Sequence, residues 1–168
     1  MRAWPLELVN GQPLDPVTTA EHVDALRSQV VPDLFAQFDP SHLPRTSLPA
    51  LALAAAAYRQ GNRMGEAVSL ALRESLFEGG RDISRQDVLV SIANAHGVGD
   101  VGPEDDERVR EEWREGQSRG VTGSPHFFCG DIAAFCPSLD ISRDAEGHIH
   151  LRRNAEALDL FLTECFKS

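Results

Sequence analysis

The sequence has little positive charge and no long apolar run. Its 16 Lys and Arg residues stand against 26 Asp and Glu residues, which gives a formal net charge of −10. Binding to a phosphate backbone depends on clustered Lys and Arg. The most apolar run, Leu48–Tyr58, is much shorter than the ~20 residues that a membrane span needs. We therefore expect neither a nucleic acid nor a membrane as a partner.

Cysteine is also scarce. The chain contains three cysteines, Cys129, Cys136 and Cys165, and its first residues, MRAWPLELVNG, lack the basic and apolar regions of an export signal. An odd count without such a signal is typical of a cytoplasmic protein with mostly reduced thiols. A framework of several disulfides is not expected, although a pairing of Cys129 with Cys136 stays open.

What the sequence does contain is helical periodicity through its middle. At 168 residues the chain has the length of one domain with its own core. Apolar spacing, N-terminal caps and glycine or proline stops predict five successive helices in residues 18–118. We place them at Thr18–Val31, Ser47–Gln60, Asn62–Glu78, Ser84–His96 and Pro103–Ser118.

Strand character lies at the two ends of the chain. Met1–Val9 alternates loosely before the turn signal Asn10-Gly11 and predicts a short strand. His126–Cys129 and Ala133–Cys136 predict a hairpin around Gly130-Asp131. Residues 141–151 fit either a loop or a further ribbon. The last helix is predicted over Arg153–Phe166, with a buried face of Ala157, Leu158, Phe161, Leu162 and Cys165.

Two segments carry a resemblance to a known family. ALRESLFEGGRDISRQDVLVSIANAHGV (Ala71–Val98), followed by a charged helix and GVTGSPHFF, resembles DsbA-like thioredoxin-fold proteins. More narrowly, the chain is similar to FrnE-like dithiol-disulfide isomerases and to 2-hydroxychromene-2-carboxylate isomerases. The resemblance implies an α/β, thioredoxin-like fold with an inserted helical domain. We assign residues 1–17 and 119–168 to the thioredoxin-like part and residues 18–118 to the insertion.

The resemblance also implies a site around Pro125. Base rates favour a trans X-Pro bond, whereas the family has its corresponding proline in cis, before a core strand. The expected substrate-binding residues are Thr122, Gly123, Ser124, Pro125 and His126. The substrate implied is a protein or a small-molecule thiol or disulfide.

The Cys-x-x-Cys motif of the family is not found in this sequence, and neither is the strand that delivers it. Two interpretations stay open: the chain is a shortened product, or the protein has lost its redox element. Either way the N-terminal βα element is missing from the expected fold, and the catalytic residue is unknown. We expect a thiol-disulfide oxidoreductase or isomerase that is truncated or degenerate and weakly active as this chain.

Two other functions stay open. One is a non-catalytic protein that binds peptides or forms a homodimer through an exposed sheet edge beside Met1–Val9. The other is a glutathione-dependent isomerase or transferase relative. No cofactor is expected except glutathione in this last case.

The remaining cysteines and histidines have two interpretations as well. Cys129 and Cys136 are a candidate redox pair, because facing hairpin strands bring such positions near each other. Both are otherwise packing residues, with Cys129 in the core and Cys136 at an edge. The spacing of His126, His148 and His150 with these cysteines matches no compact zinc module, so no metal site is expected.

Overall fold

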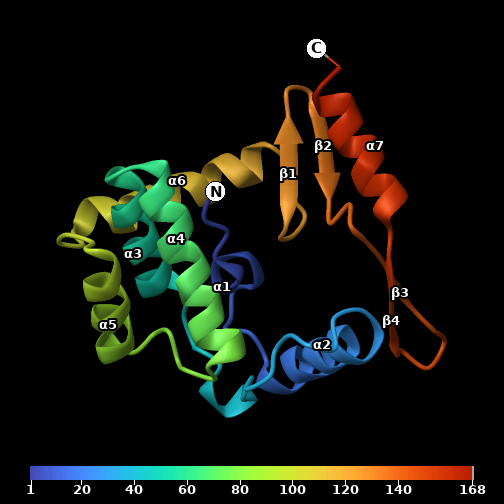
Figure 1. The fold of residues 1–168 in the computed structure, drawn as a ribbon, viewed down its shortest axis with the longest axis horizontal. Coiled ribbons are helices and arrows are strands. Elements are labelled where there is room, and N and C mark those ends of the chain that lie inside the picture. The colour runs from blue at the N-terminus through green and yellow to red at the C-terminus, as the bar shows by residue number, and fades with distance from the viewer. Residues whose placement is uncertain (168) are drawn as a thin grey trace.

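The fold consists of a helical body, a β-hairpin covered by one helix, and a β-ribbon beside another helix (Figure 1). The structure is a computed structural model, and it describes residues 1–167. Its helices are α1 (Leu6–Asn10), α2 (Pro16–Gln29), η1 (Pro40–His42), α3 (Leu48–Arg59), α4 (Asn62–Arg73), η2 (Glu74–Glu78), α5 (Gln86–His96), α6 (Pro103–Ser118) and α7 (Ala155–Cys165). Its strands are β1 (His126–Cys129), β2 (Ile132–Phe135), β3 (Leu139–Arg143) and β4 (Ile149–Arg153).

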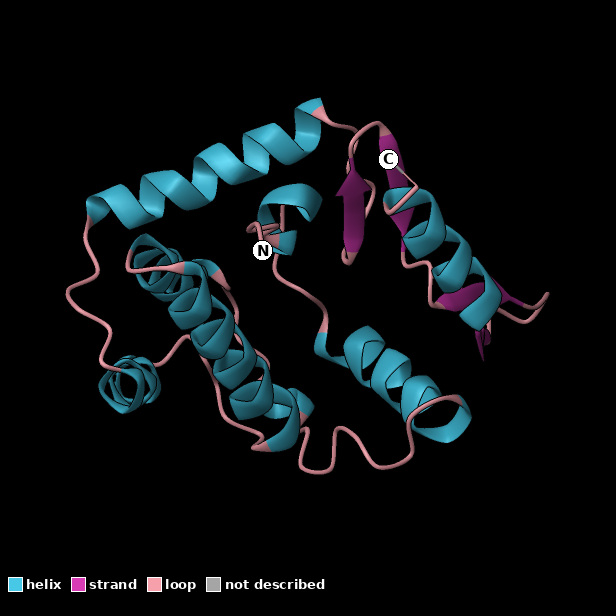
Figure 2. Ribbon diagram, turned by 45° about the horizontal axis from the view of Figure 1, so that its top comes forward, coloured by secondary structure: helices cyan, strands magenta, loops and turns pink. Residues whose placement is uncertain are grey.

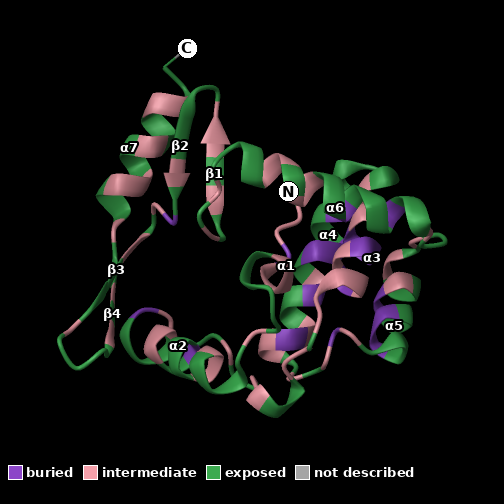
Figure 3. Cartoon of the chain, turned by 180° about the vertical axis from the view of Figure 1, so that it is seen from behind, coloured by how far each residue is buried: buried purple, intermediate pink, exposed green. Residues whose placement is uncertain are grey.

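The main apolar core lies in the helical body. It is built from α3, α4, η2 and α5, and buried residues gather there in Figure 3. The alanine-rich α3 lets α4 and α6 approach closely, and Leu53 and Val68 are almost fully excluded from solvent. The core residues are Ala50, Leu53, Ala54, Ala57, Val68, Leu72, Leu76, Ile83, Val88, Leu89 and Ile92.

Most predicted elements are confirmed. All five central helices form, and Pro103–Ser118 and His126–Cys129 have the predicted bounds. The second hairpin strand begins one residue earlier than predicted, at Ile132. Residues 141–151 belong to a ribbon, because β3 and β4 pair antiparallel with Ile141 opposite Leu151. The strands form two separate two-stranded sheets.

The predicted strand at Met1–Val9 is wrong. Leu6–Asn10 is a helix that ends at Gly11, where φ is 69°. The reason lies far along the chain, because the Glu7 carboxylate accepts hydrogen bonds from the Ser47 amide (2.6 Å) and the Thr46 hydroxyl (2.8 Å). Glu7 thereby anchors α1 at the start of α3, where a carboxylate is favoured by the helix dipole. The homodimer edge expected beside Met1–Val9 therefore has no strand to form on.

The starts of α5, α2 and α7 differ from their predicted positions, and Arg153, the predicted start of α7, belongs to β4. Ser84 was expected to cap α5, but its amide and hydroxyl donate to Asp82 Oδ1, at 2.8 and 2.6 Å. This local turn takes Ser84 out of the helix, which begins at Gln86. Asp15, not predicted as a cap, accepts from the Thr18 amide at 2.8 Å and starts α2 two residues early. The predicted domain boundary after residue 17 therefore falls inside α2.

The α2 helix lies against the C-terminal ribbon. The Gln29 side-chain amide donates to the Ile149 carbonyl at 3.0 Å and accepts from the Leu151 amide at 2.8 Å. Arg153 donates to the Val30 carbonyl at 2.8 Å. One glutamine thus satisfies the outer edge of β4 much as a neighbouring strand would.

The FEGG segment that carried part of the resemblance has a structural role. Phe77 packs edge-on against Phe35 at 5.4 Å between ring centroids, and it stacks on Phe38 at 5.8 Å. Glu78 accepts from the Phe35 and Ala36 amides at 2.8 and 3.1 Å. These contacts hold the loop between α2 and α3 against η2.

The α7 helix is less buried than predicted. Ala157, Leu158, Phe161 and Cys165 are half-buried, Leu162 is exposed, and no residue in the described length of α7 is fully buried. The reason is that the hairpin covers one side of the helix only. No described helix is long and apolar enough to cross a membrane.

Candidate functional site

The candidate site is the loop that connects α6 to β1. Figure 2 shows α6 running from the helical body to the hairpin, so the helix fixes where the loop begins. The loop leaves the helix through Gly120, where φ is 71°, and the Val121 amide donates back to the Gly116 carbonyl at 3.0 Å. At Gly123 a Cβ would lie 2.6 Å from the Phe135 ring. Only glycine therefore fits at residue 123 without moving that ring.

Ser124 and Pro125 form the centre of the loop. Their peptide bond is cis, which is the form that the resemblance implies. The Pro125 carbonyl accepts from the Cys136 amide at 2.9 Å, so the loop is fastened to the end of β2. Among the described residues, the amide and carbonyl of Ser124 take part in no hydrogen bond, and both Ser124 and Pro125 are exposed. A backbone donor and acceptor without a partner in the described chain thus lie on an exposed residue next to a strand.

The ends of the loop are held by His126. Its Nδ1 lies 3.4 Å from the Thr122 amide, so this nitrogen accepts the amide proton. The imidazole stacks on Phe128 with 4.8 Å between centroids, and the Arg119 guanidinium carbon lies 3.8 Å from the centre of the Phe128 ring. Sequence reasoning missed Arg119 and Phe128. The available signal was the two-residue spacing of His126 and Phe128, which places both side chains on one face of β1.

The structure separates the candidate redox pair, so this prediction is wrong. Cys129 lies opposite Ile132 at the hairpin turn, whereas Cys136 lies beside Pro125 at the other end. Cys136 is four residues from Ile132, and four residues along a strand span about 13 Å, beyond the ~7 Å that a disulfide allows between Cα atoms. The expected burial is also reversed, because Cys136 is buried and Cys129 is only half-buried. The Cys129 sulfur instead lies 3.6 Å from the Cys165 carbonyl oxygen.

The three thiols should react with iodoacetamide at different rates. Burial raises the pKa of Cys136, and Cys136 is only 6% exposed. Since the thiolate is the nucleophile and needs access, Cys136 should be alkylated at least about tenfold more slowly than the half-buried Cys129. Mass spectrometry of timed samples measures the three rates. Denaturant should make the rates similar, and equal rates in the folded chain would contradict the placement of Cys136.

His148 and His150 contact Asp144 at the turn of the β3–β4 ribbon. Asp144 Oδ2 lies 3.1 Å from His148 Nδ1 and 3.0 Å from His150 Nε2, and Oδ1 accepts from the His148 amide at 2.8 Å. The hydrogen bond with His150, opposed by partial desolvation, holds the pKa of Asp144 well below its usual range. In the described part of the chain, no three His, Cys, Asp or Glu side chains are arranged so that they could hold a metal ion.

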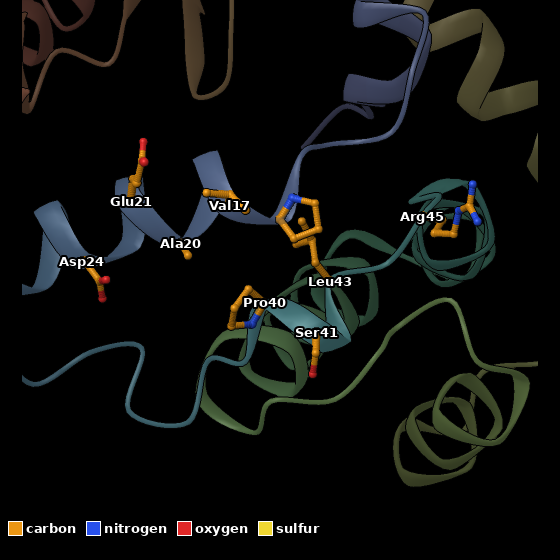
Figure 4. A pocket seen from close by; sticks show the side chains of 9 residues that line it. Val17, Ala20, Glu21, Asp24, Pro40, Ser41, Leu43 and Arg45 are labelled. Carbon is orange, nitrogen blue, oxygen red and sulfur yellow. The ribbon is translucent and has the colours of Figure 1, made fainter. Parts of the chain in front are cut away.

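A separate surface depression lies between α2 and η1 (Figure 4). Its volume is about 560 Å³, and apolar residues such as Val17, Ala20 and Leu43 line it together with Glu21 and Arg45. No residue of the Thr122–His126 loop lines it. It is therefore separate from the candidate site.

Comparison with known proteins gives one match. Residues 1–145 match the family described as DSBA-like thioredoxin domain. The matched segment includes the helical body, the loop at Ser124-Pro125 and the β1–β2 hairpin. No significant match is found among curated proteins or among solved structures.

Proposed function

Because the chain belongs to the DSBA-like thioredoxin domain family, we propose that it binds thiol or disulfide substrates at Thr122–His126. The family as a whole is of the thiol-disulfide oxidoreductase type. In such exchange a thiolate attacks one sulfur of a substrate disulfide. The role of this loop in the reaction is to align the substrate backbone beside the reacting sulfur.

The backbone of Ser124 is the observation that carries the proposal. Ser124 is exposed, and its amide and carbonyl bind no other described residue. An extended peptide that pairs with both groups adds a short strand to the protein, and such pairing gives affinity without reading side chains. This suits a protein that acts on cysteine in varied contexts. The Arg119 guanidinium, which lies over the Phe128 ring, adds a positive charge near the loop.

Turnover by the chain as given should be slow. The sequence has no Cys-x-x-Cys pair, and none of its cysteines lies at a helix N-terminus, where the dipole would lower a thiol pKa. Cys136 is buried with a raised pKa. The finer assignment, a weakly active relative of the FrnE-like isomerases, therefore rests on the loop and not on a nucleophile.

Substitution of Ser124 tests the loop directly. Ser124→Pro removes the free amide proton, so it should weaken binding of a short extended peptide by about fivefold or more, the value of one lost hydrogen bond. Ser124→Ala is the matched control, because it keeps the backbone donor and should bind like the wild type. The probe is a fluorescein-labelled peptide whose single cysteine carries glutathione in a mixed disulfide, followed by fluorescence anisotropy. Equal affinity of all three proteins would refute the proposal.

A second function, peptide binding without exchange, is favoured by the same free backbone together with the buried Cys136. The two functions differ in their dependence on the substrate sulfur. A peptide with serine in place of the modified cysteine should bind more weakly if the site serves disulfides. Equal binding of the two peptides, with no glutathione released, would instead assign a binding role alone.

A further inference from the structure

The end of β1 and the end of α7 bring two cysteines together. Both elements run in the same direction in Figure 1, and the Phe127 and Phe161 rings meet with 6.0 Å between centroids. From Phe127, two strand residues advance about 7 Å to Cys129. From Phe161, four helical residues advance about 6 Å to Cys165. The two cysteines are therefore in register, and the Cys129 sulfur lies 3.6 Å from the Cys165 carbonyl oxygen.

Both sulfurs are also accessible, because Cys129 and Cys165 are half-buried and the third cysteine, Cys136, is buried at the far end of the hairpin. Desolvation, together with a hydrogen bond and a charge interaction with Cys129, raises the pKa of Cys165 to about 11. Cys165 is thus a neutral thiol at physiological pH. A small disulfide reagent should react first at Cys129.

We propose that Cys129 and Cys165 are a redox-active dithiol whose disulfide fastens α7 to the β1–β2 hairpin. The oxidant is a low-molecular-weight disulfide such as oxidised glutathione. The Cys129 thiolate attacks one of its sulfurs, forms a mixed disulfide and releases one glutathione thiolate. Cys165 then loses its proton to solvent and attacks the Cys129 sulfur, which expels the second glutathione thiolate. Two protein thiols are oxidised, and one disulfide is reduced to two thiols.

The oxidised state should hold α7 more firmly. No described residue of α7 is fully buried, so the reduced helix depends on contacts such as Phe127 with Phe161. A cross-link between positions 36 residues apart lowers the entropy of the detached state. This inference does not depend on the substrate loop, because neither cysteine belongs to Thr122–His126.

The test is oxidation of the full chain with oxidised glutathione, followed by mass spectrometric mapping without reduction. The expected product joins Cys129 to Cys165 within one chain and leaves Cys136 as a free thiol. Oxidation should slow chymotrypsin cleavage after Phe161 at least tenfold, because cleavage there requires α7 to open. Glutathione held on Cys129 with no cross-link, or cross-linking between two chains, would overturn the proposal.

Single substitutions give the matched controls. Cys165→Ser should trap glutathione on Cys129, and Cys136→Ser should oxidise like the wild type. Loss of the cross-link in Cys136→Ser would show that Cys136 belongs to the redox-active pair, which would overturn the proposal. Peptide binding by Ser124→Ala and Ser124→Pro is measured separately, so failure of the dithiol and failure of the substrate loop are distinguishable.

Discussion

Asp105→Ala should lower the free energy of unfolding by about 2–4 kcal/mol. Asp105 is 2% exposed, and its carboxylate accepts from Arg59 Nε at 3.1 Å, Arg59 Nη2 at 2.9 Å and the Gly102 amide at 2.9 Å. It therefore both caps α6 and joins α6 to the end of α3. Loss of a cap costs about 1 kcal/mol, and charge-assisted hydrogen bonds contribute about 1.5–3 kcal/mol each.

Urea denaturation of Asp105→Ala beside Glu104→Ala checks this expectation. Glu104 also faces Arg59, at 3.6 Å, but both side chains are exposed. Its removal should cost less than about 1 kcal/mol, as is usual for an exposed ion pair. Similar losses of stability in the two variants would contradict a larger contribution of the buried Asp105 carboxylate than of the exposed Glu104 carboxylate. Because α6 positions the Thr122–His126 loop, Asp105→Ala should also weaken peptide binding.

Gly65→Ala should destabilise the helical body by about 1–3 kcal/mol. A Cβ at residue 65 would overlap the Tyr58 ring, which packs across α3 and α4. Helix propensity alone predicts the opposite sign, because alanine in a helix is favoured over glycine by about 1 kcal/mol. The steric overlap should outweigh the gain in helix propensity, since forcing extra volume into a packed interface costs about 1–3 kcal/mol.

A thermal or urea unfolding experiment on Gly65→Ala decides between the two effects by the sign of the change in the free energy of unfolding. Gly99→Ala is the control, because a Cβ there would meet only the end of the flexible Gln60 side chain at 3.5 Å. Combining Gly65→Ala with Tyr58→Leu should recover part of the lost stability, since leucine leaves room for the new methyl group. A Gly65→Ala variant that is more stable than the wild type would contradict the packing at this contact.

Local signals explain which elements could be predicted. Pro103 and the acids after it start α6, and Gly130-Asp131 separates the two hairpin strands, so these elements follow from neighbouring residues. Met1–Val9 is too short for its periodicity to separate a strand from a helix. Its helical state depends on Glu7 bonding to Thr46 and Ser47, about forty residues away.

In the candidate site, too, some features could be predicted from the sequence and others depend on distant contacts. The resemblance predicts a site at Thr122–His126 and implies the cis bond, but the unpaired amide and carbonyl of Ser124 follow from three-dimensional placement alone. The cysteine pairing was mispredicted because hairpin spacing considers only neighbours along the chain. Cys165 reaches Cys129 through the direction in which α7 packs on the hairpin, and no sequence spacing encodes that direction.

The most direct test of the central claim is an NMR titration of the ¹⁵N-labelled chain with the glutathione-modified peptide. We expect the amide signals of Thr122, Gly123, Ser124 and His126 to shift most and Ser124→Ala to give the same pattern. Ser124→Pro should need at least about fivefold more peptide to reach half of the shift at the remaining loop amides. Shifts confined to the depression between α2 and η1, or an unchanged response of Ser124→Pro, would contradict the assignment of substrate binding to this loop.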